Sequence, residues 1–202
     1  MVVDAFVLNL WLYVLAARKP RYNGGRPPRI NKKPFCLDGK IGGTGQMARS
    51  TTTLVGAAGE HYVAAYLSGA QLIVAIPRAG IPGSDLFVSK EKGGQPLRVQ
   101  VKTGTQATRK TKEEGPIYLW ATSYAAIERN DKHLWYAYVY LNGWPDGEKL
   151  PEVFFVPSRV VVRCMKECRA NKETWPYFWM RVKDAEKYRG RVGLRGLLNA
   201  LR

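Results

Sequence analysis

Asp85, Gln100 and Lys102 are polar residues in two neighbouring segments, and their types and spacing could support metal-dependent hydrolysis. Both segments alternate polar and apolar residues, which is typical of β-strands. The Gly93-Gly94 pair between them predicts a two-residue hairpin turn. Such a turn would place Asp85 opposite Lys102 and would bring all three polar side chains to one face of the sheet, where opposed Cβ atoms lie about 5 Å apart. This arrangement could form a hydrolytic site, or it could be an ordinary surface salt bridge.

A fourth polar residue, Glu60, lies in the segment that precedes these strands. Residues 56–68 have the spacing of an amphipathic helix. Glu60 falls on the same helix face as the apolar Val63 and Leu67. A carboxylate on a buried face is costly unless it is paired or binds a cation. The spacing alone leaves two interpretations open: Glu60 contributes to the site, or it lies at the edge of the apolar face and reaches water.

The remaining pattern predicts an α/β fold with a mixed sheet, because the order is helix, three strands, helix, strand and the sheet includes a hairpin. Residues 117–129 are ambiguous, since Tyr118 lies in a possible short strand and Ser123 could cap a helix. Residues 105–115 are expected to form a polar loop. Strands are expected at 71–77, 84–90, 97–103, 134–141 and 152–156, and helices at 56–68, 160–170 and 194–201.

Composition restricts the class of partner. The chain has 202 residues, of which 46% are hydrophobic, and this is enough for one domain with appendages. The 32 basic and 16 acidic residues give a net charge of +16. Such an excess indicates a polyanionic partner, either nucleic acid or an anionic membrane surface, or it serves only solubility. Three cysteines offer no disulfide framework and favour a reducing, cytoplasmic location.

The first 46 residues differ in character from the rest of the chain. The apolar run at 5–17 is too short to span a bilayer comfortably, and its positive charges follow it, unlike those of a signal peptide. Residues 19–45 are rich in Pro, Gly, Lys and Arg and lack periodicity, which is typical of disorder. We expect an extension that precedes a natural start at Met47, with no membrane association; a membrane-associating or targeting segment is the alternative.

The residues named above, taken in order, resemble the PD-(D/E)xK nuclease superfamily, which includes many restriction enzymes, Holliday-junction resolvases and group I intron homing endonucleases. The sequences Gly56-Ala-Ala-Gly59-Glu60, Ser84-Asp85-Leu and Val99-Gln100-Val-Lys102-Thr103 look closest to a group of small uncharacterised nuclease-like proteins. The resemblance covers about residues 52–182. Two departures are visible: Pro82 is not adjacent to the acid, and Gln100 stands in place of the acid of the (D/E)xK triplet.

The resemblance implies a restriction-endonuclease-like fold, with a mixed central sheet flanked by helices, and Mg²⁺-dependent hydrolysis of DNA phosphodiester bonds, with Mn²⁺ as a substitute. It implies that Glu60, Asp85 and the Gln100 side-chain oxygen bind the metal. Lys102 would stabilise the charge that develops on the phosphate or would orient the attacking water. Because Gln100 carries no charge, we expect weaker cation binding, and either a slow enzyme or one that needs high Mg²⁺ or Mn²⁺.

The same interpretation divides the chain into an extension at 1–46, a nuclease domain at 47–182 and a basic helical tail at 183–202. DNA is the expected partner, RNA is the alternative, and a homodimer is suggested by analogy alone. Two other functions compete with this interpretation. The chain could be a non-catalytic nucleic-acid-binding module, or it could be an interaction protein with a membrane-apposed N-terminus. Nucleic-acid contacts are expected from Arg98, Thr103, Arg109, Lys110 and Lys112, although solvated surface charges would look the same.

Overall fold

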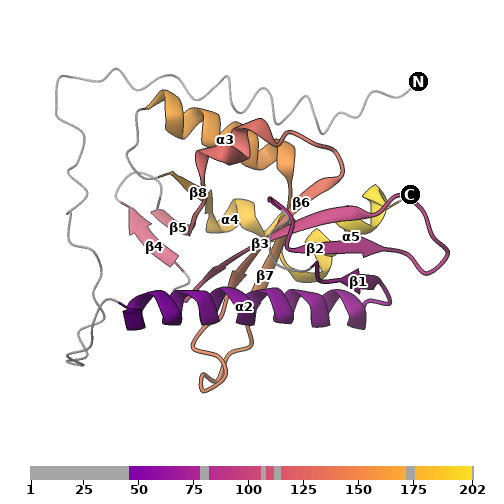
Figure 1. Ribbon diagram of the computed structural model, residues 1–202. Coiled ribbons are helices and arrows are strands. Elements are labelled where there is room, and N and C mark those ends of the chain that lie inside the picture. The colour runs from indigo at the N-terminus through magenta and orange to yellow at the C-terminus, as the bar shows by residue number, and fades with distance from the viewer. Residues whose placement is uncertain (1–45, 78–81, 106–107, 112–114, 172–175, 202) are drawn as a thin grey trace. The chain divides into compact units, whose positions relative to one another are not determined.

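The computed structural model describes residues 46–77, 82–105, 108–111, 115–171 and 176–201 (Figure 1). The extension expected at 1–46 lies outside the described residues, apart from Gln46. The helices are α2 (Gln46–Gly69), η1 (Tyr124–Glu128), α3 (Ser158–Ala170), α4 (Val182–Ala185), η2 (Glu186–Tyr188) and α5 (Gly190–Ala200). The strands are β1 (Ile73–Ala75), β2 (Leu86–Ser89), β3 (Leu97–Gly104), β4 (Thr108–Thr111), β5 (Gly115–Ala121), β6 (Leu134–Tyr140), β7 (Glu152–Pro157) and β8 (Tyr177–Arg181).

A five-stranded mixed sheet is the centre of the fold, as predicted. Its strand order is β1-β2-β3-β6-β7, and β3 and β6 are parallel whereas the other neighbours are antiparallel. Every residue of β6 is buried, because the strand lies between β3 and β7 and is covered on both faces. The α/β class is therefore confirmed.

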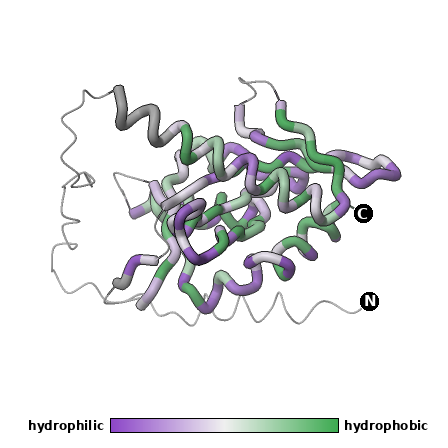
Figure 2. The backbone as a smooth tube through the Cα atoms, turned by 90° about the horizontal axis from the view of Figure 1, so that it is seen from below, coloured by the Kyte–Doolittle hydropathy of each residue, from purple (hydrophilic) through white to green (hydrophobic). Residues whose placement is uncertain are grey.

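Helices cover both faces of this sheet, and the alternation of residues along β6 separates two cores. Trp135, Ala137 and Val139 pack with α2 and α5, whereas Tyr136 and Tyr138 pack with α3 and β5. In Figure 1, α2 and α3 lie on opposite sides of the strands. Figure 2 shows hydrophobic stretches in the interior and hydrophilic stretches in the outer turns.

A second, three-stranded sheet has the order β4-β5-β8. It includes part of the segment predicted as a loop, since β4 (Thr-Arg-Lys-Thr) pairs with β5. The loop prediction was wrong here because the basic residues suggested solvent exposure, and exposed charges are also usual on an edge strand. The two alternatives for 117–129 both occur: β5 ends at Ala121, and Ser123 Oγ accepts a hydrogen bond from Ala125 N at the start of η1.

The turn between β2 and β3 is wider than the predicted two-residue turn. Residues 90–96 connect the strands, and Gly93 N donates a hydrogen bond to Lys90 O at 3.1 Å. Gly93 and Gly94 have φ values of 82° and 114°, which other residues rarely adopt. The Gly-Gly pair therefore belongs to the turn, as expected, but it does not form the whole connection.

The wider turn changes the strand register. Phe87 pairs with Arg98, and the same register continued along β2 places Asp85 opposite Gln100. The predicted pairing of Asp85 with Lys102 is thus wrong by two residues. Because side chains alternate with a period of two, a shift of two keeps these residues on the predicted face.

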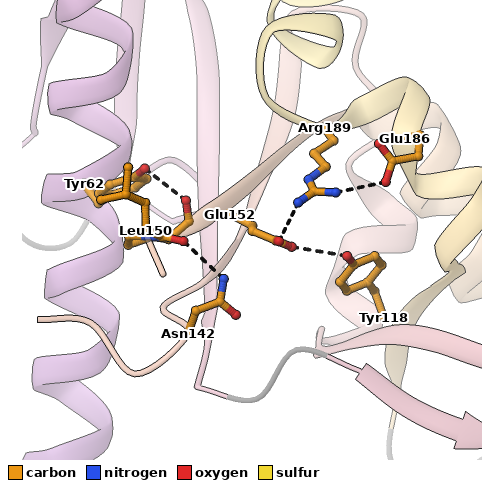
Figure 3. A network of polar contacts seen from close by, with 8 residues as sticks. Tyr62, Tyr118, Asn142, Leu150, Glu152, Glu186 and Arg189 are labelled. Atoms are coloured by element: carbon orange, nitrogen blue, oxygen red, sulfur yellow. Dashed lines mark hydrogen bonds and ion pairs between the residues drawn. The ribbon is translucent and has the colours of Figure 1, made fainter. Parts of the chain in front are cut away.

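The C-terminal residues are part of the same compact unit, which spans Gly43–Arg202. The tail expected at 183–202 contains α5, whose Leu194 and Leu197 are buried in the core beside α2. A polar network also joins this end of the chain to β7 (Figure 3): Arg189 forms an ion pair with Glu152 at 2.6 Å, and Tyr118 Oη donates to the same carboxylate at 3.2 Å. None of the described helices is both long and apolar enough to cross a membrane.

Candidate active site

Asp85 immediately precedes β2, and both its backbone and its side chain bind β3. Its N–H donates to Val99 O at 2.9 Å, and its Oδ2 accepts from Val101 N at 2.6 Å. The carboxylate thus takes the hydrogen bond that the backbone of a longer β2 would supply. This contact ends the strand pair and holds Asp85 at the edge of the sheet. Its Oδ1 makes no hydrogen bond to the described part of the chain.

Gly59 brings α2 close to the C-terminal half of β3. A Cβ atom at this position would lie 1.9 Å from Thr103 Oγ1, so only glycine allows this approach. Glu60 follows directly in the sequence. Because β3 continues to Gly104 while β2 begins at Leu86, opposite Val99, the edge of β3 beyond that point is not covered by β2. Glu60 and Asp85 are held near this uncovered edge from different elements.

The charges that act on Glu60 include those of two other predicted site residues. Burial raises the pKa of Glu60 above its ordinary value, and the negative charge of Asp85 raises it further. The positive charges of His61 and Lys102 act in the opposite direction. The carboxylate of Glu60 is therefore within electrostatic reach of both Asp85 and Lys102. Glu60 is half-buried. Its burial alone does not decide between a residue of the site and a residue at the edge of the apolar face that reaches water.

Lys102 is half-buried on β3 and shares a sheet face with Gln100, in agreement with the predicted alternation. Its ammonium forms no ion pair within 4 Å in the described part of the chain. An ammonium group offers three hydrogen-bond donors. These donors are available at the edge where Asp85 is anchored.

Gln100 has a partner that the sequence did not reveal. Its Oε1 accepts a hydrogen bond from Arg129 Nη1 at 3.1 Å. Arg129 follows η1, and its guanidinium packs against Gly83, where an added Cβ would lie 2.6 Å from Cζ. Gly83 also has a positive φ of 79°. The contact joins segments that are far apart in the sequence, and only the glycine at position 83 could have suggested a close approach.

The residues predicted to bind nucleic acid have different surroundings. Arg98 forms an ion pair with Asp131 at 2.5 Å, and Thr103 packs against Gly59. Arg109 is exposed on β4. Lys112 and the side chain of Lys110 lie outside what the structure describes. Only Arg109 of this set is both described and exposed to solvent.

The donor set at the site is suited to a hard divalent cation. Two carboxylates that repel each other, with a neutral amide nearby, provide oxygen ligands of the kind that Mg²⁺ prefers, and Mg²⁺ usually keeps several waters. Among the described residues, no group of three or more His, Cys, Asp or Glu side chains could hold a metal ion. A cation here would have the carboxylates of Glu60 and Asp85 as its charged protein ligands, with water at other positions.

An open pocket of about 540 Å³ lies elsewhere, beside the Glu152 network. Its lining includes Tyr66, Glu152 and Arg189, and none of the predicted site residues. Glu152 and Arg189 neutralise each other there, and burial followed by the Glu152 charge raises the pKa of Tyr118 to about 12. These contacts are those of a structural network, so we do not place the active site in this pocket.

Comparison with known proteins finds similarity among solved structures. No protein-family model and no curated protein matches the chain. Among solved structures, the chain is similar to a bacterial homing endonuclease, with 16% sequence identity and a TM-score of 0.47. The similar region covers 73% of this chain and 91% of the homing endonuclease.

Proposed function

We propose that this chain is a Mg²⁺-dependent endonuclease that hydrolyses phosphodiester bonds of DNA. One arrangement carries the proposal: Asp85 binds β3 through Val101 N, Lys102 lies on β3, and Gly59 brings the helix that carries Glu60 against Thr103 of the same strand. The charges of Asp85 and Lys102 both act on the carboxylate of Glu60. Metal-assisted phosphodiester hydrolysis uses these groups.

We assign the metal to the carboxylates of Glu60 and Asp85. A bound divalent cation would polarise the scissile phosphate and lower the pKa of an attacking water. Asp85 is held in place by its bond to Val101 N, so little reorganisation is needed when Oδ1 becomes a ligand. The side-chain oxygen of Gln100 already accepts a hydrogen bond from Arg129, which favours a different role for Gln100.

Lys102 would donate a hydrogen bond to the phosphate oxygen on which negative charge develops. Such a hydrogen bond accelerates a reaction when it is stronger in the transition state than in the ground state. The half-burial of Lys102 lowers the local dielectric and so strengthens this interaction. The net charge of +16 supports a polyanionic substrate.

A plasmid-nicking assay tests the proposal. The full chain should convert supercoiled DNA to nicked or linear forms with Mg²⁺ or Mn²⁺, and EDTA should stop the reaction. Asp85→Asn keeps an oxygen that can accept from Val101 N, and it should reduce cleavage by about 100-fold or more. Asp146→Asn, an exposed position in another loop, is the matched control and should cleave like the wild type. Undiminished, metal-dependent cleavage by Asp85→Asn would exclude this site.

A non-catalytic nucleic-acid-binding module is a second candidate, and Gln100 is the observation that favours it. The amide provides no negative charge for a cation, and its oxygen is engaged by Arg129. This candidate predicts salt-sensitive DNA binding in EDTA, together with no cleavage in the presence of any divalent metal.

A further inference from the structure

Arg129 is a half-buried cation without a carboxylate partner in the described part of the chain. Burying a charge is unfavourable unless it is paired. A guanidinium has five N–H donors, and one of them is used by the Gln100 oxygen. The side chain therefore keeps both its charge and most of its donors.

The groups that contact Arg129 directly hold it in place and are themselves uncharged. Because a guanidinium only donates hydrogen bonds, the atom of Gln100 that faces it must be the amide oxygen. On another side, Gly83 brings its backbone against the guanidinium, and a side chain there would collide with Cζ. Neither contact supplies a negative charge.

Tyr136 is the third neutral neighbour. It pairs with Gln100 in the parallel register of β3 and β6, so the two side chains share a sheet face. Its side chain is fully buried. Burial raises the pKa of Tyr136, whereas the charge of Arg129 and a hydrogen bond with it lower the pKa, so the hydroxyl faces the guanidinium.

We propose that Arg129 binds a phosphate of the nucleic-acid backbone beside the Glu60–Asp85 pair, and that Gln100 is a positioning residue for Arg129. The inference rests on the proposed function for the class of substrate. Guanidinium groups bind phosphate through two parallel hydrogen bonds, which requires a fixed orientation. A neutral amide fixes the orientation and leaves the charge for the ligand.

This role explains why glutamine rather than an acid is favourable at position 100. A carboxylate there would form an ion pair with Arg129 and would cancel the charge that binds phosphate. Gln100→Glu has almost the same size as the native side chain. It therefore tests the charge of the pair without changing the packing.

DNA binding in EDTA tests the proposal independently of cleavage. We expect Arg129→Gln and Gln100→Glu each to weaken binding of a short DNA duplex by about tenfold in fluorescence anisotropy. Each should also lower the slope of log affinity against log salt by about 0.9, the value for one phosphate contact. Arg195→Gln is the matched control: it removes one exposed charge from α5, which packs on the opposite face of the sheet.

Several results would overturn the inference. If Arg129 served only to fix the end of η1, Arg129→Gln would lower the melting temperature but bind DNA with the affinity and slope of Arg195→Gln. If Arg129→Gln does not fold, DNA binding by Gln100→Glu tests the proposal instead. Wild-type affinity of Gln100→Glu for the duplex would then contradict the proposal. Titration with inorganic phosphate separates the two sources of the anion: loss of phosphate binding with unchanged duplex binding in Arg129→Gln would exclude a nucleic-acid phosphate as the ligand.

The binding and cleavage assays separate failure of the phosphate site from failure of the proposed nuclease function. If the protein never cleaves DNA but Arg129→Gln lowers its affinity and salt slope, the phosphate site stands and the nuclease proposal fails. If cleavage depends on Asp85 but Arg129→Gln binds DNA like Arg195→Gln, the nuclease proposal stands and the phosphate site fails.

Discussion

The ionised form of Glu60 is destabilised near Asp85, because burial and the neighbouring negative charge both raise its pKa. Residues that bind cations commonly show this conflict, since the same two carboxylates are stabilised when a divalent ion lies between them. Asp85 differs, because one of its oxygens is committed to Val101 N. Position 85 therefore serves both the fold and the proposed metal.

A single substitution at Glu60 should separate these effects. In EDTA at neutral pH, Glu60→Gln should melt at a higher temperature than the wild type, because it removes a buried charge that Asp85 repels. Mg²⁺ should stabilise the wild type by about 2.7 kcal/mol when it is present at about 100 times its Kd, and should stabilise the variant less. Differential scanning fluorimetry measures both shifts. Glu167→Gln, exposed on α3, is the control, and an equal response to Mg²⁺ in Glu60→Gln and Glu167→Gln would contradict the assignment.

Among the elements, α2 and β3 make the contact that sets the geometry of the site. Gly59 allows the helix to approach Thr103, and Glu60 then lies beside the strand that carries Lys102. A second junction joins β3 to α3: Asp131 pairs with Arg98, and its backbone exchanges hydrogen bonds with Ser158 at the start of α3. These two junctions fix the two ends of β3.

Gly59→Ala tests the first junction. The added methyl group would lie 1.9 Å from Thr103 Oγ1 and 2.9 Å from Thr103 Cβ, and a β-branched side chain has little freedom to move away. We expect a loss of about 1–3 kcal/mol in the free energy of unfolding, despite the better helix propensity of alanine. Gly56→Ala on the same helix has no atom within 4 Å of its Cβ, and it should be neutral or stabilise by up to about 1 kcal/mol. Urea denaturation measures both; equal stability of the two variants would show that α2 does not approach β3 so closely.

Asp131→Asn tests the second junction through pH. The N–H of His133 and the guanidinium of Arg98 lower the pKa of Asp131, while burial opposes this shift. An acid whose pKa is lower in the folded state stabilises the protein above its unfolded pKa, and this contribution is lost as the pH falls through the folded pKa. The variant should therefore be less stable than the wild type by about 1 kcal/mol at neutral pH, with the difference vanishing in acid. Asp184→Asn, whose native carboxylate pairs with Arg181 and is more exposed than that of Asp131, should change stability by less than about 0.5 kcal/mol.

For the whole molecule, local patterns predicted which residues share a face, and long-range contacts were not predictable. Alternation placed Asp85 and Gln100 on one face even though the register is shifted by two, because a shift of two preserves parity. The turn itself was misjudged, since Gly93 and Gly94 can form either a short hairpin or part of a wider loop. The contact between Arg129 and Gln100 depends on where η1 places a side chain relative to β3, and no spacing in the sequence encodes that distance.

We expect the ammonium of Lys102 to act on the phosphodiester at the edge of β3. Single-turnover cleavage of DNA by Lys102→Met, with enzyme in excess over DNA and saturating Mg²⁺, measures this contribution. Methionine keeps the apolar stem and removes the charge, so the fold should be retained. The cleavage rate should fall by about 100-fold or more, and Lys183→Met on α4 should cleave like the wild type. A Lys102→Met protein that cleaves at the wild-type rate would contradict this expectation.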